Sequence, residues 1–162
     1  MKPIDYVELI DTYYQSKGYP AYRWTVNETA PLTRLAKPLA DCTVSLLTSG
    51  GISYRTAAPF NPTARDDFRL DEIDPESPDD AFQIHDSYYD HRDAETDLNV
   101  VFPLARLSEL AQDGVIGRVA ARLWSGFMGR TYKRRHLMDE AAPRFAEALL
   151  RDGADAVVMV PA

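Results

Sequence analysis

Apolar positions along the chain alternate between helical spacing and short unbroken runs. Over Ile4–Gln15 they recur every three or four residues, which predicts a first helix. Two apolar runs containing β-branched residues, Cys42–Leu47 and Ala156–Val160, predict strands. The second run has no polar residue, which is typical of a strand buried on both faces.

Helical spacing predicts three more helices between these two runs. They are expected over Pro103–Gly114, over Ile116–Trp124 and from an Asp139 N-cap through Leu149. Strands separated by helices indicate an α/β fold with a mostly parallel sheet flanked by helices. At 162 residues we expect one domain over the whole chain, residues 1–162.

The segment Pro59–Asp80 is rich in prolines and acids, and predicts a long acidic loop with a short strand near Phe68–Leu70. In α/β sheets, ligands bind beyond the carboxyl ends of the strands. Three connections are therefore expected to meet at one edge of the sheet: the turn Thr48–Gly51, the loop from His85, and the last residues up to Ala162.

Charge and composition exclude several classes of function. The net charge of -7 argues against binding to nucleic acid backbone or to anionic lipid. The acidic N-terminus is unlike a signal peptide, and no window is apolar enough for a membrane span. Cys42 is the only cysteine, so an intramolecular disulfide or a cysteine-rich zinc site is excluded. A cytoplasmic protein is the expectation.

The stretch Phe82–Pro103 carries the densest set of candidate chemical groups. It contains His85 and His91, and its carboxylates include Asp86, Asp90, Asp93 and Asp97. These groups could bind a metal or transfer protons, or the aspartates could simply cap turns and the following helix. The spacing matches no compact metal motif, so we name no metal site, and we take His85 and Asp97 as catalytic candidates and Asn99 as a substrate contact.

The small-residue turn after the first strand is a second candidate. Ser49, Gly50 and Gly51 could present backbone N–H groups to an anion, or the glycines could only satisfy a tight turn. Arg55 could bind a substrate carboxylate through two parallel hydrogen bonds, or form a structural salt bridge. The turn lacks the spacing of nucleotide-binding loops.

Three stretches together resemble a known family. They are VSLLTSGGISYR (Val44–Arg55), the His85–Asp97 stretch running into DLNVVFPLARLSELAQDGVIG (Asp97–Gly117), and AAPRFAEALLRDGADAVVMVP (Ala141–Pro161). They are similar to the selenoprotein B family of glycine, sarcosine, betaine and D-proline reductases. The most specific parts are the runs D-x-N-x-x-x-P from Asp97 and D-G-x-I-G from Asp113.

The resemblance implies a subunit of a multi-protein reductase that splits a C–N bond of an amine or amino acid. In that family a selenocysteine or cysteine carries the attack, and another subunit often supplies a pyruvoyl group. The redox residue is expected a position or two beyond Pro161, so no residue up to Ala162 takes that role. We therefore expect that the chain ends at a misread selenocysteine codon or was cut there.

Two other functions stay open at this point. The chain could be a non-catalytic binding or assembly module on the same scaffold, or a metal-dependent enzyme built on His85 and His91. The expected partners are other reductase subunits and a small amine or amino acid, and a homo-oligomer is also considered.

Overall fold

The computed structural model describes residues 5–21, 26, 28–29, 33–128 and 131–162. Contacts divide the chain into two compact units, Met1–Arg34 and Leu35–Ala162. In the first unit, α1 (Tyr6–Ser16) confirms the predicted helix, and the Asp5 carboxylate accepts the Glu8 N–H at its start. One domain over residues 1–162 stays a prediction.

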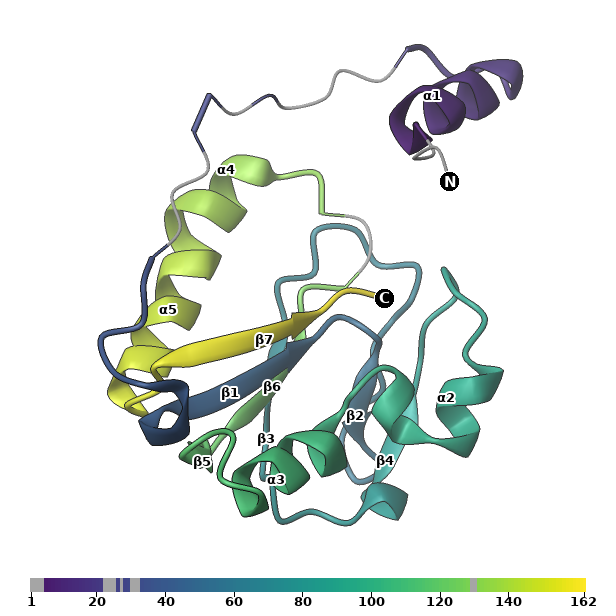
Figure 1. Ribbon diagram of the computed structural model, residues 1–162. Coiled ribbons are helices and arrows are strands. Elements are labelled where there is room, and N and C mark those ends of the chain that lie inside the picture. The colour runs from purple at the N-terminus through teal and green to yellow at the C-terminus, as the bar shows by residue number, and fades with distance from the viewer. Residues whose placement is uncertain (1–4, 22–25, 27, 30–32, 129–130) are drawn as a thin grey trace. The chain divides into compact units, whose positions relative to one another are not determined.

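The second unit has the α/β architecture expected from the sequence (Figure 1). Its elements in chain order are η1 (Leu39–Asp41), β1 (Thr43–Thr48), β2 (Ile52–Tyr54), β3 (Leu70–Ile73), η2 (Asp79–Ala81), β4 (Phe82–Ile84), α2 (Arg92–Thr96), η3 (Leu98–Val100), α3 (Leu104–Gln112), β5 (Arg118–Val119), β6 (Leu123–Gly126), α4 (Arg134–His136), a π-helical turn η4 (Leu137–Ala141), α5 (Ala142–Arg151) and β7 (Ala156–Val160).

Strand β1 is the centre of a mostly parallel sheet. It pairs in parallel with β5 and β6 along one edge and with β7 along the other. Strand β3 continues the sheet beyond β6 and is antiparallel to it. Strands β2 and β4 form a separate antiparallel pair. The predicted α/β class with a mostly parallel sheet is confirmed.

Helices cover the two faces of this sheet. Because successive side chains of a strand point to opposite faces, β1 contributes to two clusters. Leu46 packs in the larger cluster with Leu107 of α3, whereas Leu47 packs with Phe145 of α5. The two helices lie on opposite sides of the sheet in Figure 1. None of the helices in the described part of the chain is long and apolar enough to cross a bilayer.

The helix predicted over Ile116–Trp124 is wrong, because this segment forms β5 and β6. Its apolar residues do recur at helical spacing, but the spacing reflects two strands with a short break between them. Strand β6 is buried along its whole length and lies between β1 and β3 in the sheet, and pairing with these neighbours overrides the local pattern.

The last helix also differs from its prediction. Helical structure begins at Arg134, before Asp139, so Asp139 lies within a π-helical turn and caps nothing. Pro143 near the start of α5 has no N–H to donate to the preceding turn, and such interruptions accompany π-turns.

The acidic loop prediction is right in its extent but misplaces the strand, which is Leu70–Ile73.

The prediction that Ala156–Val160 is buried on both faces is wrong. Strand β7 has the predicted bounds, but among the described residues it pairs with β1 alone and is the outer strand of the sheet. Val158 is 40% exposed and Met159 is 59% exposed. The apolar run correctly predicted a strand, but it could not show whether another element covers that strand.

Candidate active site at the strand tips

The three predicted connections do meet at the carboxyl edge of the sheet. The Ser49 N–H donates to the Val160 carbonyl (3.1 Å), and the Ala162 N–H donates to the Ser49 hydroxyl (3.1 Å). On the other side of the turn, the His85 N–H donates to the Gly51 carbonyl (3.0 Å). The turn after β1 thus binds both the end of β7 and the start of the histidine stretch.

Gly51 is required by this close approach. Its φ of +72° is in the left-handed region, which favours glycine. A Cβ placed on it would lie 2.8 Å from the His85 carbonyl carbon and closer still to the oxygen, with the Met128 side chain at 3.2 Å. Any larger residue would push the turn away from His85.

Most of the turn's backbone donors are already engaged. The Ser49 N–H bonds Val160, and the Gly50 N–H donates to the Thr48 hydroxyl (3.0 Å). No described residue accepts the Gly51 N–H. Of the three N–H groups of Ser49, Gly50 and Gly51 that could bind an anion, only that of Gly51 is therefore available, and it lies beside His85.

Tyr89 is a residue of this edge that the sequence did not single out. Its hydroxyl donates to the Gly50 carbonyl (2.8 Å), and its ring packs against the core. Burial, with a smaller contribution from the charge of Asp86, raises the pKa of Tyr89 to about 12. The phenol therefore stays protonated and keeps its bond to Gly50 at neutral pH. In the sequence, this role was indicated only by the position of an aromatic residue, Tyr89, within a polar stretch.

His85 faces a cavity of about 600 Å³ beside β4 and α2. Its Nδ1 is buried and has no hydrogen-bond partner in the described chain. Arg55 and Asp97 line the same cavity, so three predicted site residues are brought together. The other polar residues that line it are Asp79, Asp80, Gln83, Glu95 and Thr96.

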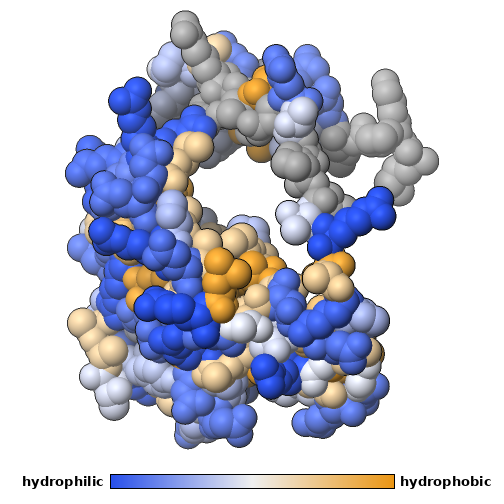
Figure 2. All heavy atoms as spheres, turned by 90° about the vertical axis from the view of Figure 1, so that its left-hand side faces the viewer, coloured by the Kyte–Doolittle hydropathy of each residue, from blue (hydrophilic) through white to orange (hydrophobic). Residues whose placement is uncertain are grey.

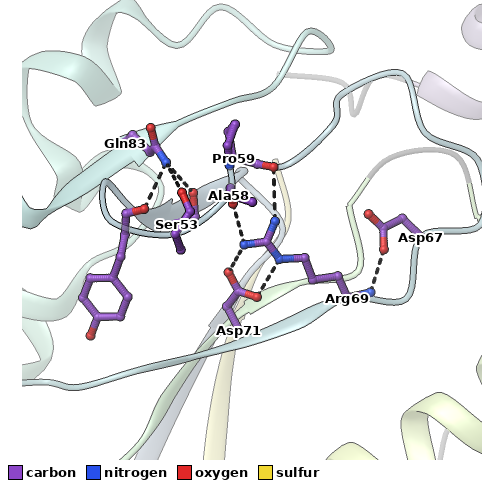
Figure 3. Close-up of polar contacts among 9 residues, drawn as sticks. Ser53, Ala58, Pro59, Asp67, Arg69, Asp71 and Gln83 are labelled. Carbon is purple, nitrogen blue, oxygen red and sulfur yellow. Dashed lines mark hydrogen bonds and ion pairs between the residues drawn. The ribbon is translucent and has the colours of Figure 1, made fainter.

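Two wall residues of this cavity are fixed by the backbone. The Arg55 Nε donates to the Asp80 carbonyl (3.0 Å), while no described residue bonds its two terminal nitrogens. The Gln83 amide donates to the Ser53 hydroxyl (3.3 Å) and to two carbonyls, those of Tyr54 and Ala57 (Figure 3). The Arg55 guanidinium is therefore held in the cavity wall through its Nε, while its two terminal nitrogens remain available to a ligand.

Asp97 and Asn99 are held by local hydrogen bonds. The Asp97 carboxylate accepts both the side-chain N–H₂ (2.9 Å) and the backbone N–H (3.0 Å) of Asn99, and these bonds lower the pKa of Asp97. The Asn99 carbonyl oxygen in turn accepts the Ala105 N–H at the start of α3 (3.0 Å). The Asp97–Asn99 pair therefore fixes the start of α3. This agrees with the alternative in which the polar residues of Phe82–Pro103 cap turns and the following helix.

The other groups of the stretch also have local partners. The Asp86 carboxylate accepts the Tyr88 N–H (2.6 Å), and Asp90 pairs with Arg92. His91 Nδ1 lies 2.8 Å from the Glu95 carboxylate on α2, but this contact does not have the geometry of a hydrogen bond. Within the described residues, no group of three or more His, Cys, Asp or Glu side chains is placed to hold a metal ion.

A further segment, Ala58–Arg69, reaches the same edge from β3. The Arg69 guanidinium binds the Asp71 carboxylate in a fork (2.7 and 2.5 Å) and donates to the Ala58 and Pro59 carbonyls (Figure 3). It also lies over the buried Phe60 ring, 4.1 Å from its centroid. This clamp orders much of the segment predicted as an open acidic loop.

Cys42 lies at the opposite, amino end of β1. It is fully buried, and its thiol is 3.3 Å from the Pro38 carbonyl. This position separates it from the turn by the length of the strand, so it does not fit the role of a redox group at the strand tips.

Comparison with known proteins identifies the family. Residues 14–162 match the family described as glycine/sarcosine/betaine reductase selenoprotein B. The chain belongs to this family. It is also 32% identical over 127 residues to the D-proline reductase subunit gamma of Acetoanaerobium sticklandii, covering 78% of this chain and 51% of that protein. The chain thus spans about half the length of this relative. No solved structure matches it.

Proposed function

We propose that the chain is a subunit of a reductase that cleaves a C–N bond of a small amine or amino acid reductively. Family membership supports the role of a reductase subunit, and the cleavage of a C–N bond is our proposal. The observation that carries the proposal is that Arg55 and His85, whose Nδ1 is buried and unpartnered, line one cavity next to the Gly51 turn. A thiol- or selenol-dependent reaction requires a reducing compartment, so we place the protein in the cytoplasm.

The cavity offers complementary groups for an amino acid. The two terminal nitrogens of Arg55 would bind a carboxylate in the bidentate geometry that guanidinium groups favour. Carboxylates of the wall, such as Glu95, would face a substrate ammonium. His85 would supply a proton to the nitrogen that leaves, with the Gly51 N–H beside it as a hydrogen-bond donor. Asp97 and Asn99 would act by holding the cavity wall in place.

The attacking group is a selenol or thiol from a residue other than Cys42. When present at the strand tips, it forms a Se–C or S–C bond while the C–N bond breaks, and the nitrogen leaves as an amine that takes its proton from His85. A dithiol reductant then supplies two electrons and two protons, which break the Se–C or S–C bond, place a hydrogen on the carbon and restore the selenol or thiol, while the dithiol becomes a disulfide. In our proposal the other reductase subunits complete the site.

The test is turnover in the complex assembled with its natural partner subunits and a dithiol reductant. Glycine, sarcosine, betaine and D-proline would be assayed separately as substrates. We expect His85→Gln to lower kcat by about 100-fold or more, as for loss of a general acid. Arg55→Gln should mainly raise KM, because it removes a contact made in both the ground state and the transition state.

The matched control is His136→Gln, because His136 lies on α4 and lines no part of this cavity. Its kcat and KM should equal those of the wild type. A complex that turns over equally well with His85→Gln and Arg55→Gln would refute the proposed site. A fully assembled complex with no activity on any of the four substrates would favour the non-catalytic assembly module instead.

A further inference from the structure

Gln83 presents a hydrogen-bond acceptor in a fixed orientation beside β4. Its side-chain nitrogen donates to the Ser53 hydroxyl (3.3 Å) and to the carbonyls of Tyr54 (3.0 Å) and Ala57 (3.2 Å). Carbonyl oxygens can only accept, so the nitrogen of the amide, and not its oxygen, must face these groups. Among the described residues, Gln83 lines the cavity of about 600 Å³, whereas none of its three partners does.

The Gln83 oxygen is therefore the polar atom that this side chain offers to a ligand. No described residue donates to it, and in Figure 3 it points away from the three hydrogen bonds of the nitrogen. The amide cannot turn to present its nitrogen to the cavity without losing these bonds. At this position the cavity accepts a hydrogen bond and donates none.

Arg55 and Gln83 lie on the same face of the β2–β4 pair. Ser53 is paired with Gln83 across the two strands, and Arg55 continues the ladder two residues later, with its N–H bound to the Ala81 carbonyl (2.8 Å). Residues two apart on a strand share a face, and such diagonal neighbours lie about 7–8 Å apart. One small amino acid can therefore reach Arg55 with its carboxylate and Gln83 with its nitrogen.

The charges of the cavity wall favour a cationic nitrogen near Gln83. Arg55 is the only Lys or Arg among the described residues that line the cavity. Asp79 and Asp80 line it as well, and no described residue pairs with their carboxylates. Glu95 and Asp97 complete the acidic part of the wall. The cavity thus has one group for an anion and a surplus of acceptors for N–H groups.

The cavity lacks the open aromatic faces that bind quaternary ammonium groups in other proteins. Phe82 is the only phenyl, phenol or indole ring among its described lining residues, and it is 3% exposed. Its ring stacks on Tyr54, with centroids 5.1 Å apart, and lies 6.1 Å from Phe102. Figure 2, seen from the side of α5, shows hydrophobic residues gathered in the middle of a mostly hydrophilic face, whereas β4 and α2 lie on the opposite side of Figure 1.

We propose that this cavity selects amino acids whose nitrogen carries at least one N–H, and that it discriminates against quaternary amines. The substrate carboxylate binds Arg55, and its N–H donates to the Gln83 oxygen. A trimethylated nitrogen would cover the Gln83 oxygen without donating to it, and an acceptor that loses water without gaining a partner weakens binding. This inference rests on the proposed function and narrows its substrate class.

The test is a titration of the ¹⁵N-labelled full chain with glycine, sarcosine, N,N-dimethylglycine and betaine, followed through the signals of the Gln83 side-chain amide and the His85 backbone amide. The four ligands share one carboxylate, and successive methyl groups replace the N–H groups until betaine has none. We expect the first three to bind with a Kd within a few-fold of each other. Betaine should have a Kd about tenfold higher or more.

A variant separates hydrogen bonding from the size of the methyl groups. Gln83→Met keeps the length of the side chain and removes the acceptor, so the Kd of dimethylglycine, read from the His85 amide, should rise about tenfold. The Kd of betaine should stay unchanged, which also shows that the cavity is intact. Ser53→Ala is the matched control, because it removes one of the three bonds to the Gln83 nitrogen and keeps the oxygen. Its four Kd values should equal those of the wild type.

The inference is overturned if betaine binds the wild-type chain as tightly as dimethylglycine, if Gln83→Met weakens both equally, or if none of the four ligands binds. Its failure is distinguishable from failure of the proposed function. An assembled complex that turns over betaine as well as sarcosine, and loses activity in His85→Gln, would contradict this inference alone. Selective binding in an assembled complex that reduces none of the ligands would contradict the reductase function alone.

Discussion

The turn Thr48–Gly51 and the polar side chains of the stretch Asp86–Asn99 both form hydrogen bonds, yet they differ in the sequence distance that these bonds span. The turn makes contacts with residues far along the chain, at His85, Tyr89 and Val160. The carboxylates of the stretch bond groups a few residues away. Long-range contacts hold the turn to its neighbours, and local contacts hold the part of the cavity wall around Asp97.

The largest effect should come from the turn. Gly51→Ala adds a methyl group against the His85 carbonyl at a φ of +72°, so it combines a backbone cost with overpacking. We expect a loss of about 3 kcal/mol in the free energy of unfolding. Gly114→Ala is the control, since its φ is +71° but nothing lies within 4 Å of the added Cβ, and it should cost about 1 kcal/mol. Equal losses in urea denaturation would show that the contact with His85 is unimportant.

The wall of the site should respond more weakly. Asn99→Ala removes the oxygen that accepts the Ala105 N–H at the start of α3. Loss of such a cap costs about 1 kcal/mol. Glu95→Ala, at a largely exposed carboxylate, should change the urea midpoint by less than half as much. If both variants unfold at the same urea concentration, Asn99 does not secure the helix.

A smaller change is expected at the bond between the two regions. Tyr89→Phe keeps the packed ring and removes the hydroxyl that donates to the Gly50 carbonyl. The loss should be about 0.5–1 kcal/mol in thermal denaturation. Tyr132→Phe, at an exposed ring, should leave the melting temperature unchanged. A shift of the same size in the control would mean that the Gly50 bond contributes nothing.

The smallest effect is the pH dependence of Asp97. Hydrogen bonds from Asn99 hold the pKa of this carboxylate below its usual value of 3.8 in the folded state. Its contribution to stability is therefore present at neutral pH and is lost as the pH falls through the folded pKa. The difference in urea midpoint between wild type and Asp97→Ala should shrink on going from neutral pH to about pH 3. A difference that grows with acidification would contradict this assignment.

The sequence predicted the parts of this structure that depend on chain-wide pattern. The two apolar strand runs were found, and their parallel arrangement was enough to bring the turn and Ala162 to one edge, whereas His85 reaches the turn through the separate antiparallel pair of β2 and β4. It could not distinguish Ile116–Trp124 as two strands, because the apolar spacing of a strand pair can imitate a helix. Nor could it show that β7 lies at the edge, since burial depends on neighbours that no local pattern reveals.

The candidate site was predicted in a similar way. Arg55, His85 and Asp97 were chosen by residue type and do share one cavity. The hydrogen bond of Tyr89 to Gly50 was missed because it joins residues far apart in sequence. The capping by Asp97 and Asn99 was foreseen only as an alternative, since short polar side chains can either bond locally or face a ligand.

The most direct test of the account is the contact between the turn and its neighbours in solution. In a ¹⁵N-edited nuclear Overhauser spectrum, the His85 amide should show a cross-peak to the protons of Gly51, and the Ala162 amide one to the Ser49 β-protons. Both follow from the hydrogen bonds at the strand tips. If both cross-peaks are missing from a well-resolved spectrum of the folded chain, the proposed active site is not assembled there.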